Sequence, residues 1–469
     1  MTFPVFVKYI MYRCDEDATG NIMTSFNYNL NQKIETVRQC QVVVAGAGPA
    51  GICAALTAAQ MGCDTVLIER HSMPGGMAYA GEVSPFMLNH LDEESMDHPL
   101  YADWLSRMGK YHSAATLNYI DDKMGPKWGK LYINKYYAAL SAEDMLNAAG
   151  VKVLYEHTLF DTVKENGQIK TLILHNRSGL TAVSGEVYID ATGDGVLAAQ
   201  AGCKIEIGND EGLCQPMTWC FKVAPVRIPD EDFWCGEWRK KIQQEYSKAK
   251  AAGDLSCPRE NILMFQSTTP DTVHFNTTRV VLHDPLDSGS YQEAGMIARE
   301  QIREFLFWLR NRIEGFENAE IVSMGQQLGI RESRRVIGKF CLTADDLYRR
   351  RKFPDAIARC NYPVDIHSPS GSGTTYTAAA DYSDYYEIPF RCLIPQGCDN
   401  LLTAGRIISS DHITNSSLRI MPVCCATGQG AGAGAALAVK NGLLPGQVNG
   451  IQVRTELIDF GAFLGASKL

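Results

Sequence analysis

The sequence lacks a metal-binding or redox cysteine motif, although it has 15 cysteines among its 469 residues, and the adjacent pair Cys424-Cys425 resembles neither a zinc site nor a typical redox dithiol. The cysteines are scattered without a C-x-x-C pair, and the C-x2-C-x2-C-x3-C-P spacing of ferredoxin-like clusters is absent. The sequence therefore predicts no bound metal. Scattered cysteines of this kind are typical of reduced, mostly buried thiols in a cytoplasmic protein.

A long apolar run and an excess of positive charge are also lacking. No apolar stretch is long enough to span a bilayer. The 44 Lys and Arg residues are outnumbered by 53 Asp and Glu residues, which gives a formal net charge of −9. Because an acidic chain has no general affinity for nucleic acid or for an anionic membrane, we expect neither as a partner.

The length predicts more than one structural unit. A chain of 469 residues exceeds the usual size of a single core. The first 22 residues differ from the rest of the chain and lack the features of a signal peptide, and Met23 is an alternative start. We treat residues 1–37 as an N-terminal extension and expect a cytoplasmic protein.

The clearest pattern that is present lies in residues 41–69, QVVVAGAGPAGICAALTAAQMGCDTVLIE. Val42–Val44 predicts a buried strand, residues 52–61 a helix of small apolar residues, and Thr65–Ile68 a second strand. The glycine-rich turn between strand and helix matches the G-x-G-x-x-G fingerprint of dinucleotide sites in its full context. A glycine-rich turn in an ordinary βαβ unit is the structural alternative.

The residues of this turn have separate roles in a dinucleotide site. Gly46 permits the tight turn, Gly48 lets the backbone approach a diphosphate, and Gly51 lets the helix pack closely on the strand. The helix N-terminus offers unpaired N–H groups and a favourable dipole to the phosphates. Glu69, after the second strand, is placed to accept hydrogen bonds from a ribose. The predicted contacts in the turn are Gly46, Gly48, Pro49, Ala50 and Gly51.

Further motifs follow along the chain. They are ER…GGM at 69–77, IDATGDG at 189–195, QPMT at 215–218, GIRESRRVIGKF at 329–340 and AGR…SLRIMP…GQGAG at 404–432. With the fingerprint, these motifs make the chain resemble the bacterial FAD-dependent oxidoreductases, which share the FAD-binding fold of glutathione-reductase-like and fumarate-reductase-like flavoproteins. That family is often grouped with heterodisulfide-reductase-like proteins. The iron–sulfur clusters of that grouping are not expected, because the cysteine spacing is absent.

The resemblance implies FAD as the cofactor and an α/β fold. A Rossmann-like FAD-binding domain with a parallel sheet (38–215 and 396–445) would be interrupted by a mixed α+β substrate domain (216–395), and residues 446–469 would form a C-terminal tail. Beyond the turn, the implied cofactor contacts are Glu69, Arg70, Gly75, Gly76, Met77, Ala191, Thr192, Gly193, Asp194, Gly405, Arg406 and Met421.

A glycine-rich stretch at residues 428–438 lies within a helix that is predicted to begin near Pro422 and to end near Lys440. Glycine inside a helix costs about 1 kcal/mol relative to alanine, so its repeated use requires a reason. Helix faces without side chains allow close approach to another element or to the cofactor. The resemblance implies that the helix N-terminus points at the flavin pyrimidine ring, where its dipole stabilises negative charge. Close helix packing alone is the alternative.

Three residues are predicted to take part in the reaction. His412 follows the AGR motif and Arg419 precedes the glycine-rich helix, so the family pattern places both near the isoalloxazine. His412 is predicted to act as a general base or hydrogen-bond donor, with a structural role as the alternative. Arg331 is predicted to clamp a substrate carboxylate or a flavin phosphate, with an interdomain salt bridge as the alternative. His274 and His283 are weaker candidates for moving a proton.

Together these motifs predict an FAD-dependent oxidoreductase that acts on an undetermined small organic substrate by hydride or electron transfer at flavin N5. No second nucleotide fingerprint follows a strand, so an external electron donor or acceptor is a possible partner. Two alternatives remain open. One is an electron-transferring flavoprotein subunit of a larger redox complex, and the other is a flavin-dependent RNA-modifying protein, which the acidic charge disfavours.

Overall fold

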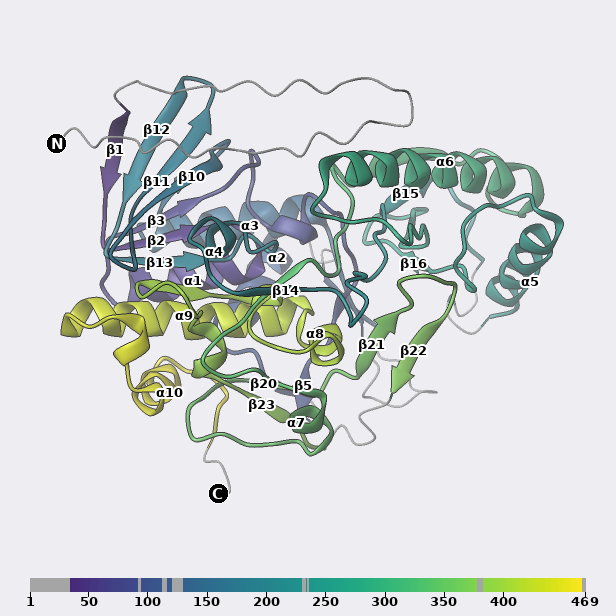
Figure 1. The fold of residues 1–469 in the computed structure, drawn as a ribbon. Coiled ribbons are helices and arrows are strands. Elements are labelled where there is room, and N and C mark those ends of the chain that lie inside the picture. Colours follow the sequence, from purple (N-terminus) through teal and green to yellow (C-terminus); the bar gives the residue numbers. More distant parts are fainter. Residues whose placement is uncertain are drawn as a thin grey trace.

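The computed structural model describes residues 34–91, 94–111, 116–119, 130–229, 233, 236–377 and 383–465. A five-stranded parallel sheet lies at its centre, in the order β24-β13-β2-β3-β9 (Figure 1). Its strands are β2 (Val42–Ala45), β3 (Thr65–Ile68), β9 (Lys152–Leu154), β13 (Val187–Asp190) and β24 (Leu401–Thr403). Two distant parts of the chain therefore build one sheet, which confirms the predicted α/β class.

The central sheet is covered on both faces. Val42 and Val44 of β2 belong to the core formed with helices α1 (Pro49–Gln60) and α9 (Met421–Asn441). Val43 and Ala45 belong to the core formed with an antiparallel sheet on the other face. That sheet contains β10 (Thr158–Glu165), β11 (Gln168–Asn176) and β12 (Gly179–Ser184), and β1 (Glu35–Gln39) pairs with β12. Alternate side chains of a strand point to opposite faces, so a strand buried on both faces is apolar throughout.

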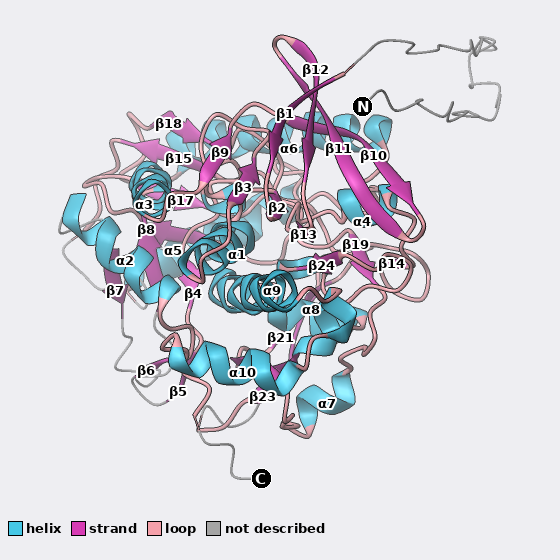
Figure 2. Cartoon of the chain, turned by 90° about the vertical axis from the view of Figure 1, so that its left-hand side faces the viewer, coloured by secondary structure: helices cyan, strands magenta, loops and turns pink. Residues whose placement is uncertain are grey.

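Helices α1 and α9 lie side by side against the sheet, and Figure 2 views both nearly end-on. Gly428 and Gly432 of α9 face α1. A Cβ atom at Gly428 would lie 2.1 Å from the carbonyl oxygen of Ala50, and one at Gly432 would lie 2.4 Å from that of Ala54. Because no side chain fits at such distances, these two glycines bring the two helix backbones into direct contact.

The other two glycines of α9 face different neighbours. A Cβ atom at Gly430 would lie 2.9 Å from Cβ of Ile357, and one at Gly434 would lie 2.4 Å from the ring of Phe390. Ile357 belongs to β20 (Ala356–Cys360). All four glycines thus have a packing reason, and the helix stops at Gly442 with φ of +62° as the C-cap.

The inserted region has a core of its own, to the right in Figure 1. Its antiparallel sheet runs in the order β16-β17-β15-β18. These strands are β15 (Phe221–Ala224), β16 (Met264–Gln266), β17 (Val273–Phe275) and β18 (Glu320–Met324). Helices α5 (Glu237–Ala252) and α6 (Ser288–Arg312) pack on this sheet, and the rings of Phe221 and Phe275 stack with centroids 5.0 Å apart. This region has the mixed α+β character that was expected.

The last part of the predicted substrate domain packs differently. β20 pairs with β23 (Tyr386–Pro389), and both belong to the same core as α1 and α9. Residues 446–469 were predicted as a tail, yet α10 (Gly450–Asp459) buries Val453 and Leu457 in this core. The core that contains α1 and α9 therefore extends beyond the expected boundaries.

Shorter elements complete the fold. The helices are α2 (Leu100–Tyr111), α3 (Lys135–Ala148), α4 (Val196–Gln200), α7 (Ala344–Tyr348) and α8 (His412–Leu418). The strands are β4 (Phe86–Met87), β5 (His90–Leu91), β6 (Glu94–Ser95), β7 (Thr116–Tyr119), β8 (Lys130–Ile133), β14 (Ile205–Ile207), β19 (Arg334–Val336), β21 (Val364–His367) and β22 (Thr374–Thr377). Among the described residues, none of these helices has the length and apolar character needed to cross a membrane.

A buried ion cluster joins the inserted region to the rest. Glu82, which is 2% exposed, lies 3.1 Å from Nζ of Lys135 and 3.3 Å from Nζ of Lys222. The hydroxyl of Ser323 donates to the same carboxylate at 2.9 Å. Lys222 and Ser323 lie on the inserted sheet, whereas Lys135 begins α3. Removing one partner would leave a buried charge uncompensated, so this cluster fixes how the two parts meet.

The packing of α9 predicts opposite effects for two Gly→Ala substitutions that change helix propensity by the same amount. Gly432→Ala places a Cβ atom 2.4 Å from the Ala54 carbonyl, whereas a Cβ atom at Gly109 of α2 meets nothing within 4 Å. We expect Gly432→Ala to destabilise the protein by about 1–3 kcal/mol through overpacking. Gly109→Ala should stabilise it by up to about 1 kcal/mol. Urea denaturation of both variants measures the difference, and a Gly432→Ala variant as stable as the wild type would contradict the close-contact account.

Candidate functional site

A cavity of about 500 Å³ opens at the carboxyl ends of the parallel strands. Its wall includes Ala45 at the end of β2, Glu69 after β3, Ala191 after β13 and Ala404 after β24. The N-terminal turns of α1 and α9 and part of the inserted region close the remaining sides. This is the position at which open parallel sheets bind their ligands.

The glycine-rich turn forms one end of the cavity. Gly46 has φ of +97°, and a Cβ atom there would lie 2.6 Å from the Ala191 carbonyl oxygen. A Cβ atom at Gly76 would lie 2.7 Å from the Cα atom of Gly48. Gly48 caps α1 without a side-chain hydrogen bond, so the N–H groups that follow Pro49 in the first turn of this 12-residue helix remain available at the wall. This end has the bare backbone surface that suits a phosphate.

Most predicted cofactor residues near this turn line the cavity. Gly46, Gly48, Pro49, Ala50, Arg70, Gly76 and Met77 do so. Gly51 and Gly75 are not lining residues. A Cβ atom at Gly51 would overlap the Gly46 carbonyl, and Gly75 has φ of +118°, so both shape the backbone instead.

Glu69 lies in the wall beside this turn and is 5% exposed. Its Oε2 accepts a hydrogen bond from the Ala47 N–H at 2.7 Å, and its Oε1 accepts one from the His71 N–H at 2.9 Å. Burial raises the pKa of this carboxyl, although the backbone hydrogen bonds oppose the shift. Each oxygen keeps a second lone pair, so the carboxylate is held in place and still able to accept from a ligand hydroxyl.

A second segment beside Glu69 was not predicted from the sequence. His157, Thr158 and Leu159 line the cavity, and the His157 N–H donates to the Glu69 carbonyl at 2.9 Å. These residues follow β9, which pairs with β3. No local pattern marks them, because their position depends on which strands are neighbours.

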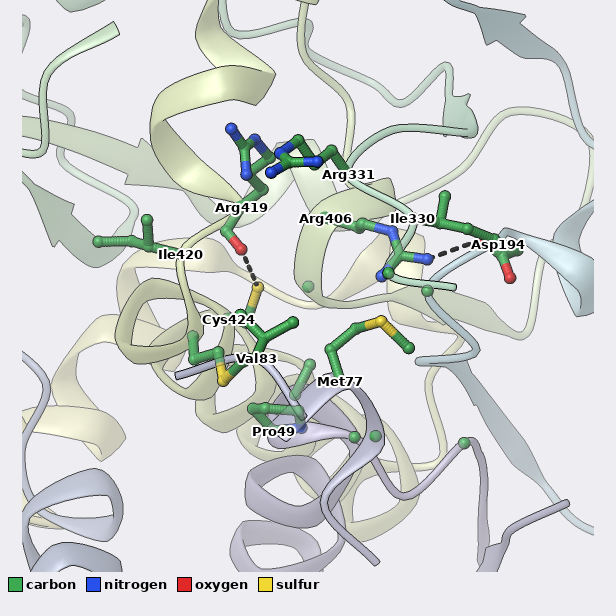
Figure 3. A pocket seen from close by; sticks show the side chains of 18 of the residues that line it. Pro49, Met77, Val83, Asp194, Ile330, Arg331, Arg406, Arg419, Ile420 and Cys424 are labelled. Carbon is green, nitrogen blue, oxygen red and sulfur yellow. Dashed lines mark hydrogen bonds and ion pairs between the residues drawn. The ribbon is translucent and has the colours of Figure 1, made fainter. Parts of the chain in front are cut away.

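The ATGDG and AGR motifs meet in the middle of the cavity. Arg406 Nη2 lies 2.7 Å from Asp194 Oδ1, and the Ser333 hydroxyl donates to the same oxygen at 2.9 Å (Figure 3). Ala191, Thr192, Gly193, Asp194, Gly405 and Arg406 all line the wall, as does Met421. Both predicted motifs therefore reach one site from distant parts of the chain.

The arginines of GIRESRR divide into different roles. Arg335 pairs with Glu332 in the interior, and Arg334 Nη1 donates to the Asp194 carbonyl at 2.9 Å. Arg331 lines the cavity, and its Nη1 donates to the Pro216 carbonyl at 2.8 Å and to Thr218 Oγ1 at 2.6 Å. Two arginines of the motif are thus structural, and the third faces the site.

His412 is not brought to the cavity. It is the first residue of α8 rather than part of a loop, and its Nδ1 lies 2.8 Å from Glu332 Oε1. Arg419 does line the cavity, and its Nη2 donates to the Asp365 carbonyl at 3.1 Å. His274 and His283 are also absent from the wall, and His274 is 1% exposed.

A histidine and an aspartate that were not predicted from the sequence lie beside Arg331 and Arg419. Arg279 Nη2 donates to His367 Nδ1 at 2.7 Å, so Nε2 of the neutral ring carries the proton and faces Asp365 Oδ1 at 3.4 Å. Burial and the charge of Arg331 lower the pKa of His367 to about 3. Burial opposes ionisation of Asp365, but the His367 hydrogen bond and the charges of Arg419 and Arg331 hold its pKa below the usual value. The D-x-H spacing on β21 was the available sequence signal, because alternate residues of a strand share a face.

The N-terminal turn of α9 lies between the two ends of the cavity. Ile420, Met421 and Cys424 line it, and the Cys424 thiol donates to the Arg419 carbonyl at 3.4 Å. Burial raises the pKa of this thiol to about 12, so it stays protonated. In Figure 3, Arg331 and Arg419 lie on one side of Cys424, and Pro49 and Met77 lie on the other.

The neutral state of His367 makes stability depend on pH. The unfolded chain binds a proton at this position below pH 6.5, whereas the folded protein does so only near pH 3. Stability is therefore lost as the pH falls through this window, by at most about 1.4 kcal/mol per pH unit. We expect His367→Gln to lose less unfolding free energy than the wild type between pH 7 and pH 5, by up to about 2 kcal/mol in urea denaturation. His175→Gln, at an exposed position, is the control. An unchanged pH dependence in His367→Gln would contradict the neutral assignment.

Comparison with known proteins identifies the family. The family model described as FAD dependent oxidoreductase matches residues 41–457. Dihydrolipoyl dehydrogenase from Buchnera aphidicola is 33% identical over 136 residues, 29% of this chain and 26% of that protein. Digeranylgeranylglycerophospholipid reductase from Methanothrix thermoacetophila is 28% identical over 178 residues, 37% of this chain and 42% of that protein. The chain thus matches less than half the length of either relative.

Similar solved structures include a geranylgeranyl bacteriochlorophyll reductase-like protein from Thermoplasma acidophilum, with a TM-score of 0.46 at 12% identity over 90% of this chain and 84% of that one. The p-nitrophenol 4-monooxygenase of Pseudomonas putida gives a TM-score of 0.44 at 11% identity over 90% of this chain and 84% of that one. Since the family model spans most of the sequence, this chain belongs to the FAD-dependent oxidoreductase family.

Proposed function

We propose that the cavity holds FAD with its diphosphate at the N-terminus of α1 and its isoalloxazine near the N-terminus of α9. One observation carries this proposal: the fingerprint turn, Glu69, the Asp194–Arg406 pair and Met421 all line one continuous cavity. The bare backbone at Gly46, Gly48 and Gly76 fits a diphosphate, and a side chain at Gly46 or Gly76 would collide with neighbouring backbone. When FAD is bound, its N5 atom accepts a hydride or electrons from one molecule and donates them to another.

The residues around the proposed cofactor position have distinct tasks. The free N–H groups of α1 neutralise phosphate charge, and Glu69 accepts from a ribose hydroxyl. The first turn of α9 presents the positive end of a 21-residue helix dipole to the same cavity. That end stabilises negative charge on whatever ring system lies against it. The glycines deeper in α9 serve packing, whereas its N-terminus serves the site.

The substrate end of the cavity contains Arg331 and Arg419, which we propose contact a small organic substrate. His367 is the cavity-lining histidine of this end, and its neutral ring, held by Arg279 at Nδ1, directs its Nε2–H toward Asp365. His412 holds Glu332, which also accepts from the Gln215 N–H at 3.2 Å. We therefore assign His412 a positioning role instead of the predicted role as a base.

The activity that fits best is oxidation or reduction of a small organic molecule, with an external electron donor or acceptor completing the cycle. A cavity of this volume with a polar, charged end favours this activity over simple electron relay between proteins. The acidic chain gives no support for an RNA substrate. The free cysteines of the described residues are consistent with a cytoplasmic location.

The direct test is to purify the protein, measure its FAD content and screen small molecules anaerobically in both directions. We expect one FAD per chain. We also expect one compound class either to bleach the oxidised flavin or to reoxidise the photoreduced flavin. A protein that takes up no added FAD would contradict the proposal. Reaction with redox proteins but with no small molecule would favour the electron-transferring alternative.

Glu69→Ala extends this test to the position of the cofactor. Loss of a charge-assisted hydrogen bond costs about 1.5–3 kcal/mol, so we expect FAD affinity to fall about 10- to 100-fold in equilibrium dialysis. Glu69→Gln keeps the side-chain shape and separates charge from packing. Glu186→Ala, which alters an exposed carboxylate, should leave affinity unchanged. Wild-type affinity in both Glu69 variants would place the ribose elsewhere.

A further inference from the structure

The substrate end of the cavity contains more guanidinium groups than carboxylates. Arg259, Arg331 and Arg419 line it, and Arg279 lies directly behind His367. Asp365 is the carboxylate of this end among the described residues that line the cavity. The excess is local, because the whole chain has a formal net charge of −9.

The carboxylates that line the described cavity wall are already engaged. Glu69 accepts from the Ala47 and His71 N–H groups. Asp194 pairs with Arg406 at 2.7 Å. Asp365 lies 3.4 Å from Arg419 Nη2 and 3.4 Å from His367 Nε2. None of these three forms an ion pair with Arg259 or Arg331 within the described residues.

Arg259 is the least compensated of these groups. It is 6% exposed and lines the cavity, and its Nε and Nη1 have no hydrogen-bond partner in the described part of the chain. Arg331 has only neutral acceptors, Pro216 and Thr218. Burial and the charges of Arg419 and Arg259 lower the pKa of Arg331 to about 9. A buried guanidinium without a charged partner is costly, so this arrangement favours the binding of an anion from outside the protein.

We propose that Arg259 and Arg331 form the binding site for the carboxylate of an organic acid substrate. The inference rests on the proposed function, which it deepens by naming the substrate class. Leu263, Phe265 and Ile330 line the same region and offer apolar contact to a carbon skeleton. Bidentate hydrogen bonds from guanidinium to carboxylate fix the orientation as well as the position of such a molecule.

The cofactor phosphates do not explain Arg331 and Arg419. In Figure 3, Arg331 and Arg419 lie across the cavity from Pro49, which begins the helix that faces the proposed diphosphate position. A carboxylate also fits better than a phosphate monoester. It carries one charge where the monoester carries nearly two at neutral pH, and its desolvation in an enclosed region is less costly.

The test uses the FAD-loaded protein and follows the flavin absorption spectrum during titration with benzoate, phenylacetate, acetate and succinate. Benzamide and succinamide are neutral controls of the same shape, and inorganic phosphate tests the other anion class. We expect at least one carboxylate to give a saturable spectral change, with its amide at least 10-fold weaker. A protein that binds no FAD would contradict the proposed function. A protein that binds FAD but whose flavin spectrum responds to none of the four carboxylates would overturn this inference alone.

Variants then locate the site. Arg259→Met and Arg331→Met should each weaken carboxylate binding at least 10-fold while retaining FAD, and Arg259→Lys should recover part of the loss. Arg303→Met, at a position whose side chain is 67% exposed on α6, is the matched control and should bind as the wild type does. If an Arg→Met variant fails to fold, the Lys variant and the comparison of carboxylates with amides still show whether the arginines bind a carboxylate. Wild-type carboxylate affinity in the Arg259 variants, or a spectral response to phosphate but to no carboxylate, would contradict the proposal.

Discussion

The backbone contact between α1 and α9 is the constraint on which the site depends. Gly428 and Gly432 allow α9 to lie against the carbonyl groups of Ala50 and Ala54, where any side chain would collide. The first turns of both helices consequently open on the same cavity. One helix begins at the fingerprint turn and the other near the C-terminal end of the chain, so this contact brings the two halves of the site together.

The charge of the site is organised along the cavity. Backbone N–H groups and a buried carboxylate form one end, an internal Asp194–Arg406 pair lies in the middle, and guanidinium groups gather at the other end. A chain of negative net charge thus contains a local positive region in the wall of a cavity that apolar residues also line. In a region of low dielectric such charges act strongly on one another and on any bound anion, which is why their pairing can be used to infer the ligand.

The sequence predicted those features that depend on local pattern. The strand at Thr65–Ile68 and a helix that begins near Pro422 and ends near Lys440 follow from the local sequence pattern, and the structure confirms both. The structure confirms that the glycines of α9 allow close packing, and the helix N-terminus lines the cavity, whereas its contact with the flavin stays a prediction.

Features that depend on long-range topology were not accessible in this way. His412 is close to Arg419 in sequence, yet the turn of α8 directs it to Glu332 and away from the cavity. Arg259 and the Asp365–His367 pair come from separate segments of the inserted region, and no local motif connects them. Their proximity follows only once the strands are assembled around the cavity.

A crystal structure of the protein with FAD and a bound carboxylate tests the account most directly. The account predicts the diphosphate at the N–H groups that follow Gly48, the isoalloxazine beside Met421, and the carboxylate between Arg259 and Arg331. A structure in which those two arginines bind the FAD phosphates, or in which the isoalloxazine lies away from the first turn of α9, would contradict it.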